Sequence, residues 1–113
     1  MPHLVLEHSA ELDGDVISAT CKALFKAACA NPVFTNIASV KLRSVPCHNV
    51  HMGTSPETFA HLTVWMLAGR DEDEKKALSG ALLDVMTKHL PDVGALTVDP
   101  RDMDTKTYAK RVI

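Results

Sequence analysis

The sequence predicts an α+β fold in which a tandem β-α-β repeat forms a four-stranded mixed sheet with two helices on one face. Two observations predict it. The 113-residue chain repeats itself at an offset of 58 residues, and each half has the pattern of strand, helix and strand. Such a unit makes its two strands parallel, and two units can join edge to edge. We expect a single domain, residues 1–113, with internal repeats of about 2–57 and 58–113.

The order of the elements supports the repeat more than identity at any one position. Residues 3–6 (HLVL) and 61–64 (HLTV) are both apolar and rich in strand-forming residues. The same offset relates Arg43 to Arg101 without a gap. Further matches lie between these points: Ala10 with Ala68, Asp13 with Asp71, and Ala23-Leu24 with Ala81-Leu82.

The first half is predicted to run from a strand at residues 4–7 to a return strand at residues 40–45. Between them, Asp13 can cap a helix by accepting hydrogen bonds from its first free amides. Asn31-Pro32 ends that helix, because a residue before proline avoids the α conformation. The apolar face of this helix is expected to hold Ile17, Cys21, Leu24, Phe25 and Ala28.

The second half is predicted to start with a long strand at residues 58–68 and to finish with a strand at residues 96–98. Asp71 followed by Glu74 has the spacing of a capping box. Pro91 stops the helix that follows. Its apolar stripe is Leu78, Leu82, Val85 and Met86, and Lys88 and His89 lie in its last turn, where cations suit the helix dipole.

The strand at residues 58–68 is apolar on both faces, which predicts a second layer against the sheet. Two helices cover one face only, so we expect other subunits to cover the other. Residues 46–57 are expected to form a loop or hairpin. The charged tail from residue 99 to residue 113 is expected to pack across a neighbouring subunit.

Composition excludes several classes of protein. The net charge of −2 argues against a nucleic-acid binder and gives no reason for attachment to an anionic membrane. No apolar run is long enough to span a bilayer, and no signal peptide is recognised. The three cysteines, an odd number without C-x-x-C spacing, indicate a reducing, cytoplasmic location. The Cys47–His51 segment lacks the partner motif that a zinc site needs, so no metal is expected.

Pro2 is the first candidate for chemistry. Initiator methionine is normally removed before a small residue such as proline, which would leave a secondary amine at the start of a strand. Such an amine can act as a base at neutral pH if burial and nearby cations lower its pKa. Its ring also orients the lone pair. His3, and His61 at the equivalent repeat position, fit packing roles beside that amine or ordinary strand positions.

The chain resembles the tautomerase superfamily, whose members begin with a catalytic proline, and is most similar to 5-carboxymethyl-2-hydroxymuconate isomerase. Three features carry the resemblance: Pro2-His3 followed by Glu7, the segment FAHLT at residues 59–63, and the segment AGR at residues 68–70. The likeness covers nearly the whole chain. It implies a tautomerase-like fold, a homotrimer with sites at subunit boundaries, and catalysis without a cofactor.

The resemblance also implies that Arg70, Lys41 and Arg43 bind the substrate. Arg70 matches the family's carboxylate-binding residue after the third strand, and Arg43 matches the second of two alternating basic positions. Lys41 stands where the isomerase usually has arginine. Lysine keeps the charge but loses the two-pronged fork that orients a carboxylate.

The expected reaction is a proton shift in a carboxylated dienol such as 5-carboxymethyl-2-hydroxymuconate, an intermediate of aromatic compound catabolism, with Pro2 as base and acid. Two alternatives stay open. One is another Pro2-dependent reaction of the superfamily, dehalogenation or a decarboxylase-like step. The other is a non-catalytic oligomeric binding protein, which would follow if Met1 is retained and the Pro2 nitrogen is an amide.

Overall fold

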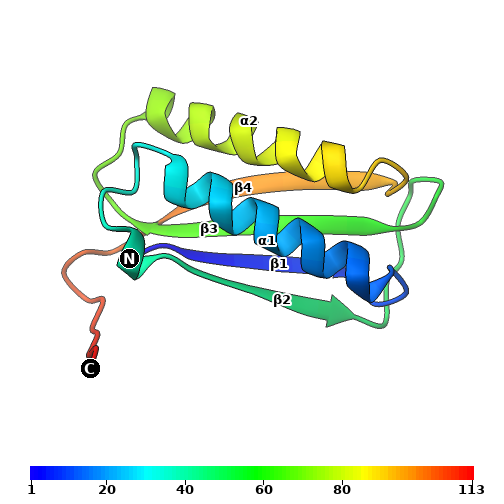
Figure 1. The fold of residues 1–113 in the computed structure, drawn as a ribbon, viewed down its shortest axis with the longest axis horizontal. Coiled ribbons are helices and arrows are strands. Elements are labelled where there is room, and N and C mark those ends of the chain that lie inside the picture. The colour runs from blue at the N-terminus through cyan, green and yellow to red at the C-terminus, as the bar shows by residue number, and fades with distance from the viewer.

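The structure is a computed structural model that describes residues 1–113. Two strand–helix–strand units follow one another along the chain (Figure 1). The first comprises β1 (His3–Ser9), α1 (Gly14–Ala30), a short 3₁₀ helix η1 (Ile37–Ser39) and β2 (Lys41–Cys47). The second comprises β3 (Phe59–Leu67), α2 (Glu72–His89) and β4 (Ala95–Met103).

The four strands form one mixed sheet in the order β2-β1-β3-β4. β1 and β2 are parallel, β3 and β4 are parallel, and the two units meet through the antiparallel pair β1 and β3. Both helices lie on the same side of this sheet (Figure 1). The predicted fold class is therefore confirmed, and β1, which begins next to Pro2, is a central strand.

Both helices start at the predicted caps. The carboxylate of Asp13 accepts hydrogen bonds from the amides of Asp15 and Val16 at 2.8 and 3.1 Å. Asp71 and Glu74 form both halves of a capping box. Each cap satisfies amides that have no partner within the helix.

The hydrophobic core lies between the helices and the sheet, and one residue predicted to belong to it does not. Phe25 is 41% exposed, whereas Leu24 is fully buried. Successive helical residues are about 100° apart around the axis, so Phe25 falls at the edge of the stripe. Thr20 is buried instead, because its hydroxyl donates to the carbonyl of Val16 at 2.7 Å.

β4 runs for nine residues, Ala95–Met103, where the sequence predicted only 96–98. The charged residues after Val98 and the proline at position 100 hid its length. β4 is an edge strand, and edge strands tolerate charged side chains and proline because one side of the backbone makes no ladder bonds.

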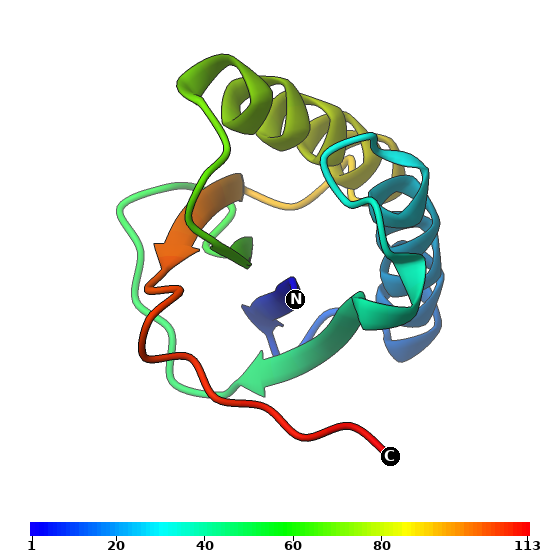
Figure 2. The same ribbon diagram turned by 90° about the vertical axis from the view of Figure 1, so that its left-hand side faces the viewer.

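The sheet face opposite the helices is uncovered in the chain. In the strand pairing, His3 of β1 lies opposite Lys41 of β2 and Trp65 of β3. The three side chains therefore share this face of the sheet. Trp65 is 40% exposed here. Viewed end-on, the C-terminal tail leaves β4 and crosses this side of the sheet toward β2 (Figure 2). Neither helix has the length and apolar character needed to cross a membrane.

Candidate active site

Pro2 lies at the start of the central strand β1, and its side chain is fully buried. Its carbonyl accepts a hydrogen bond from the backbone amide of Lys41 at 3.1 Å. This bond extends the pairing of β1 and β2 to the end of the sheet. The neighbouring strand thus fixes the backbone at Pro2. A fixed backbone would also fix the direction of the Pro2 nitrogen.

Three cations act on the terminal amine of Met1. Burial lowers the pKa of the Met1 amine below its usual value of 8.0, and the charges of Arg70, Lys110 and Lys41 lower it further. Like charges disfavour the protonated amine, so all three favour the neutral form. Arg70 and Lys41 were predicted from the sequence. Lys110 was not.

Arg70 reaches this end of the sheet through a turn at Gly69, whose φ of +133° favours glycine. The guanidinium donates to the carbonyl of Leu67 at 2.9 Å and to that of Val33 at 3.1 Å. It therefore ties the end of β3 to the loop after α1. Two of its five N–H groups are used in this way.

Lys41 and Lys110 line a hollow of about 250 Å³ next to Met1. The ammonium of Lys41 donates to the carbonyl of Ser39 at 2.9 Å, which orients it along η1. No acidic residue lines this hollow. Its charge and its position beside the amine suit a small anionic ligand. The remaining lining residues are Asn36, Ala38, Ser39 and Val112.

Arg43 lies outside this hollow. Two residues along β2 from Lys41, it donates to Nδ1 of His3 at 3.3 Å on the uncovered face. Burial lowers the pKa of His3, and the charges of Arg43 and Lys41 lower it further. Neutral His3 that accepts at Nδ1 carries its proton on Nε2, which lies 2.9 Å from the hydroxyl of Tyr108 and donates to it.

The C-terminal tail contacts its own chain at two points, and its packing across a neighbouring subunit stays a prediction. Tyr108 stacks edge-on against His3 with ring centroids 6.1 Å apart. Two residues further on, the ammonium of Lys110 lies 3.1 Å from the sulfur of Met1. Sequence reasoning missed both residues. The only signal was that Tyr108 is the sole aromatic residue of the tail.

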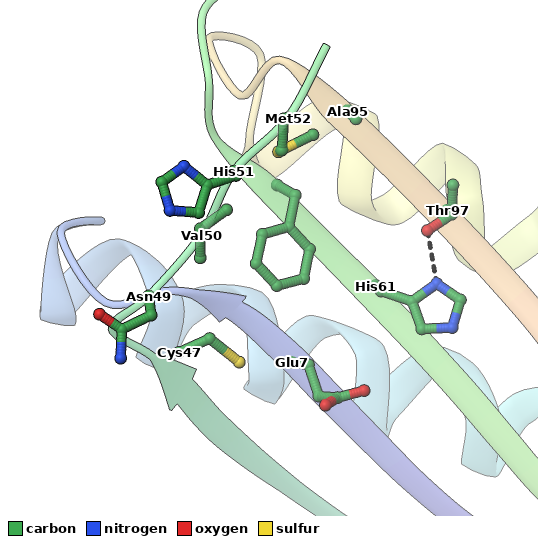
Figure 3. Close-up of a pocket in the computed structure, with 10 residues that line it drawn as sticks. Glu7, Cys47, Asn49, Val50, His51, Met52, His61, Ala95 and Thr97 are labelled. Atoms are coloured by element: carbon green, nitrogen blue, oxygen red, sulfur yellow. Dashed lines mark hydrogen bonds between the residues drawn. The ribbon is translucent and has the colours of Figure 1, made fainter. Parts of the chain in front are cut away.

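A larger hollow, of about 580 Å³, lies at the other end of the uncovered face. Figure 3 shows Glu7 and His61 on its floor and the loop after β2, with His51, along its rim. The Glu7 carboxylate in this hollow would repel an anionic ligand. Glu7 lies four residues along β1 from His3, which corresponds to about 13 Å at the spacing of residues in a strand. Nowhere in the chain do three His, Cys, Asp or Glu side chains gather to hold a metal ion.

The tandem β-α-β fold is that of the tautomerase superfamily, and the family match makes the protein an isomerase of that superfamily. The chain belongs to the 5-carboxymethyl-2-hydroxymuconate isomerase family, whose model matches residues 2–107.

Solved structures share the fold. A 5-carboxymethyl-2-hydroxymuconate isomerase from Deinococcus radiodurans R1 superposes with a TM-score of 0.84 at 24% identity, over 97% of this chain and 88% of the other. A fused 4-OT symmetric trimer gives 0.79 at 22% identity, over 96% and 90%. A macrophage migration inhibitory factor-like protein from Entamoeba histolytica gives 0.75 at 13% identity, over 97% and 95%. Among curated protein sequences, none matches this chain.

Proposed function

We propose that the protein shifts a proton in a carboxylated dienol such as 5-carboxymethyl-2-hydroxymuconate, with the Pro2 amine as general base and acid once Met1 is removed. The observation that carries the proposal is the Met1 amine, which precedes β1 and whose pKa is lowered by burial and by Arg70, Lys110 and Lys41. The Pro2 nitrogen lies one residue further into the same surroundings. Its pKa should fall for the same reasons.

In this mechanism the neutral Pro2 nitrogen takes a proton from one end of the conjugated system and returns it to a carbon at the other. The negative charge that develops on the dienolate oxygen is stabilised by nearby cations. Because the amine gives back the proton it accepted, the reaction is balanced without a cofactor.

Arg70 and Lys41 are the proposed ligands for substrate carboxylates at the amine. Arg70 is positioned by its two backbone acceptors, and Lys41 by Ser39. Arg43 would contact substrate only on the uncovered face, where it now pairs with His3. Lysine at position 41 offers a point charge, so orientation of the carboxylate depends more on Arg70.

We further propose that residues 1–113 form one tautomerase-like domain that assembles as a homotrimer, with sites at subunit boundaries. The uncovered sheet face, with Trp65 half-exposed, supports burial against other copies. Several structures that share the fold are described as trimers. A cytoplasmic location is part of the proposal, supported by free cysteines at positions 21, 29 and 47.

The decisive experiment compares Pro2→Ala with the wild type in ketonisation of a 2-hydroxymuconate-type dienol, after intact mass spectrometry has shown that Met1 is absent from both. The primary amine of the variant should lower kcat while binding persists. Pro100→Ala, on the edge strand β4 and separated from β1 by β3, is the matched control and should keep wild-type kinetics. Unchanged turnover in Pro2→Ala would reject the amine mechanism, and retention of Met1 in the natural protein would favour a binding role.

A second candidate is another reaction of the same amine, dehalogenation or a decarboxylase-like step. Lys41 favours it, because a lysine at the family's arginine position relaxes the geometry demanded of a carboxylate. A panel of mono-, di- and tricarboxylate dienols, with halogenated acrylates and 3-oxo acids beside them, separates the two. Halide or CO₂ release faster than ketonisation would select the second candidate.

A further inference from the structure

We propose that the C-terminal tail, residues 104–113, forms a wall of the hollow next to Met1 that Lys41 also lines, and that Lys110 of this tail binds a second carboxylate of the substrate. The inference rests on the proposed function and deepens it, because it makes Lys110 a determinant of specificity for substrates with more than one carboxylate. Three features of the tail carry it: an anchor, a charge without a carboxylate partner, and a position on the hollow.

The anchor is the contact between Tyr108 and His3. The backbone first turns at Asp104, whose carbonyl accepts from the amide of Tyr108 at 3.1 Å and whose carboxylate accepts from the amide of Lys106 at 3.0 Å. The Tyr108 hydroxyl then accepts from His3, at the amine end of β1. The tail is thereby held across the end of the sheet (Figure 2), and Lys110 follows two residues later.

The charge of Lys110 has no carboxylate partner. The two ion pairs of the chain join Lys75 to Asp102 and Arg101 to Asp99, and neither involves the tail lysines. The Lys110 ammonium contacts only the Met1 sulfur, a weak acceptor. Removal of Met1 would therefore expose the Pro2 nitrogen and release Lys110 at the same time.

The position of Lys110 places this free charge beside a second one. Lys41 and Lys110 both line the hollow next to Met1, and Lys41 has already given one of its three N–H groups to Ser39. A carboxylate in the hollow can accept from both ammonium groups. Arg70 does not line this hollow and would hold a different carboxylate, so the arrangement fits a dicarboxylate or tricarboxylate better than a monocarboxylate.

The kinetic test compares Lys110→Gln with Lys106→Gln, an exposed lysine of the same tail that does not line the hollow. We expect kcat/KM for a dicarboxylate dienol to fall at least tenfold in Lys110→Gln, mainly through KM, and to change little for a monocarboxylate dienol. Lys110→Arg should restore most of the loss. The acid limb of kcat/KM should also move to higher pH, because one cation fewer favours the protonated amine.

A binding test separates the inference from the proposed function. Titration of the Met1-free protein with adipate, a saturated dicarboxylate, can be followed by calorimetry without any turnover. Lys110→Gln should bind adipate at least tenfold more weakly than Lys106→Gln, and Tyr108→Ala should show a similar loss because the tail is released. If the wild type turned over no dienol while this pattern held, the proposed function would fail and the inference would stand. Equal binding by Lys110→Gln and the wild type, or no binding by the wild type, overturns the inference.

Discussion

Gly69 and Gly80 form a natural pair for testing how the turn before Arg70 is held. A Cβ added at either glycine meets no heavy atom within 4 Å, so steric overlap is the same for both. They differ in backbone conformation: Gly69 has a φ of +133°, whereas Gly80 lies inside the helix α2. Alanine should therefore act in opposite directions at the two sites.

The expected magnitudes follow from that difference. Gly69→Ala forces a side chain into a conformation that costs about 1–3 kcal/mol. Gly80→Ala removes an entropic penalty within a helix and should stabilise by about 0.5–1 kcal/mol. For a domain of this size, each kcal/mol moves the melting temperature by about 4 °C.

Urea unfolding at a fixed protomer concentration measures both variants, because the stability of an oligomer depends on concentration. Gly69→Ala should also weaken carboxylate binding, since it displaces Arg70. Equal stabilities for the two alanine variants, or a Gly69→Ala protein as stable as the wild type, would refute the assignment of strain to this turn.

Three further outcomes are expected. Leu24→Ala, at a fully buried position, should lower the free energy of unfolding by about 2–5 kcal/mol in urea, while Val112→Ala at the exposed tail should change it by under about 0.5 kcal/mol. Asp71→Ala should cost about 0.5–2 kcal/mol by thermal melting, because it removes the α2 cap. Because the pKa of folded His3 is lowered, the unfolded chain binds more protons between that lowered pKa and 6.5, so stability should rise with pH across this window. His3→Gln should flatten that rise in pH-dependent melts, and an unchanged slope would contradict the role given to His3.

Local signals were sufficient for most of the fold. The Asp71-to-Glu74 spacing located the start of α2, because a cap depends on neighbours in sequence. The repeat predicted the parallel pairs and the side on which both helices lie. Local signals failed at two places. They missed the charged second half of β4, which pairs as an edge strand. They also placed Phe25 in the core, although it lies at the boundary of the apolar stripe of α1 and is exposed.

The site divides in the same way. Pro2 stays a prediction drawn from its place in the chain, and Lys41 and Arg43, two residues apart on β2, lie on the same face of that strand. Only the tertiary structure showed that Lys41 lines the hollow while Arg43 pairs with His3.

The sequence by itself determined the strand–helix–strand repeat, the helix caps and the candidate amine, because each depends on residues near one another in the chain. The tertiary structure alone brought Tyr108 to His3, 105 residues away, and Lys110 to the amine. Their approach depends on the length of β4 and on the turn at Asp104, and no periodicity or spacing in the sequence encodes a contact that is made only after the sheet has assembled.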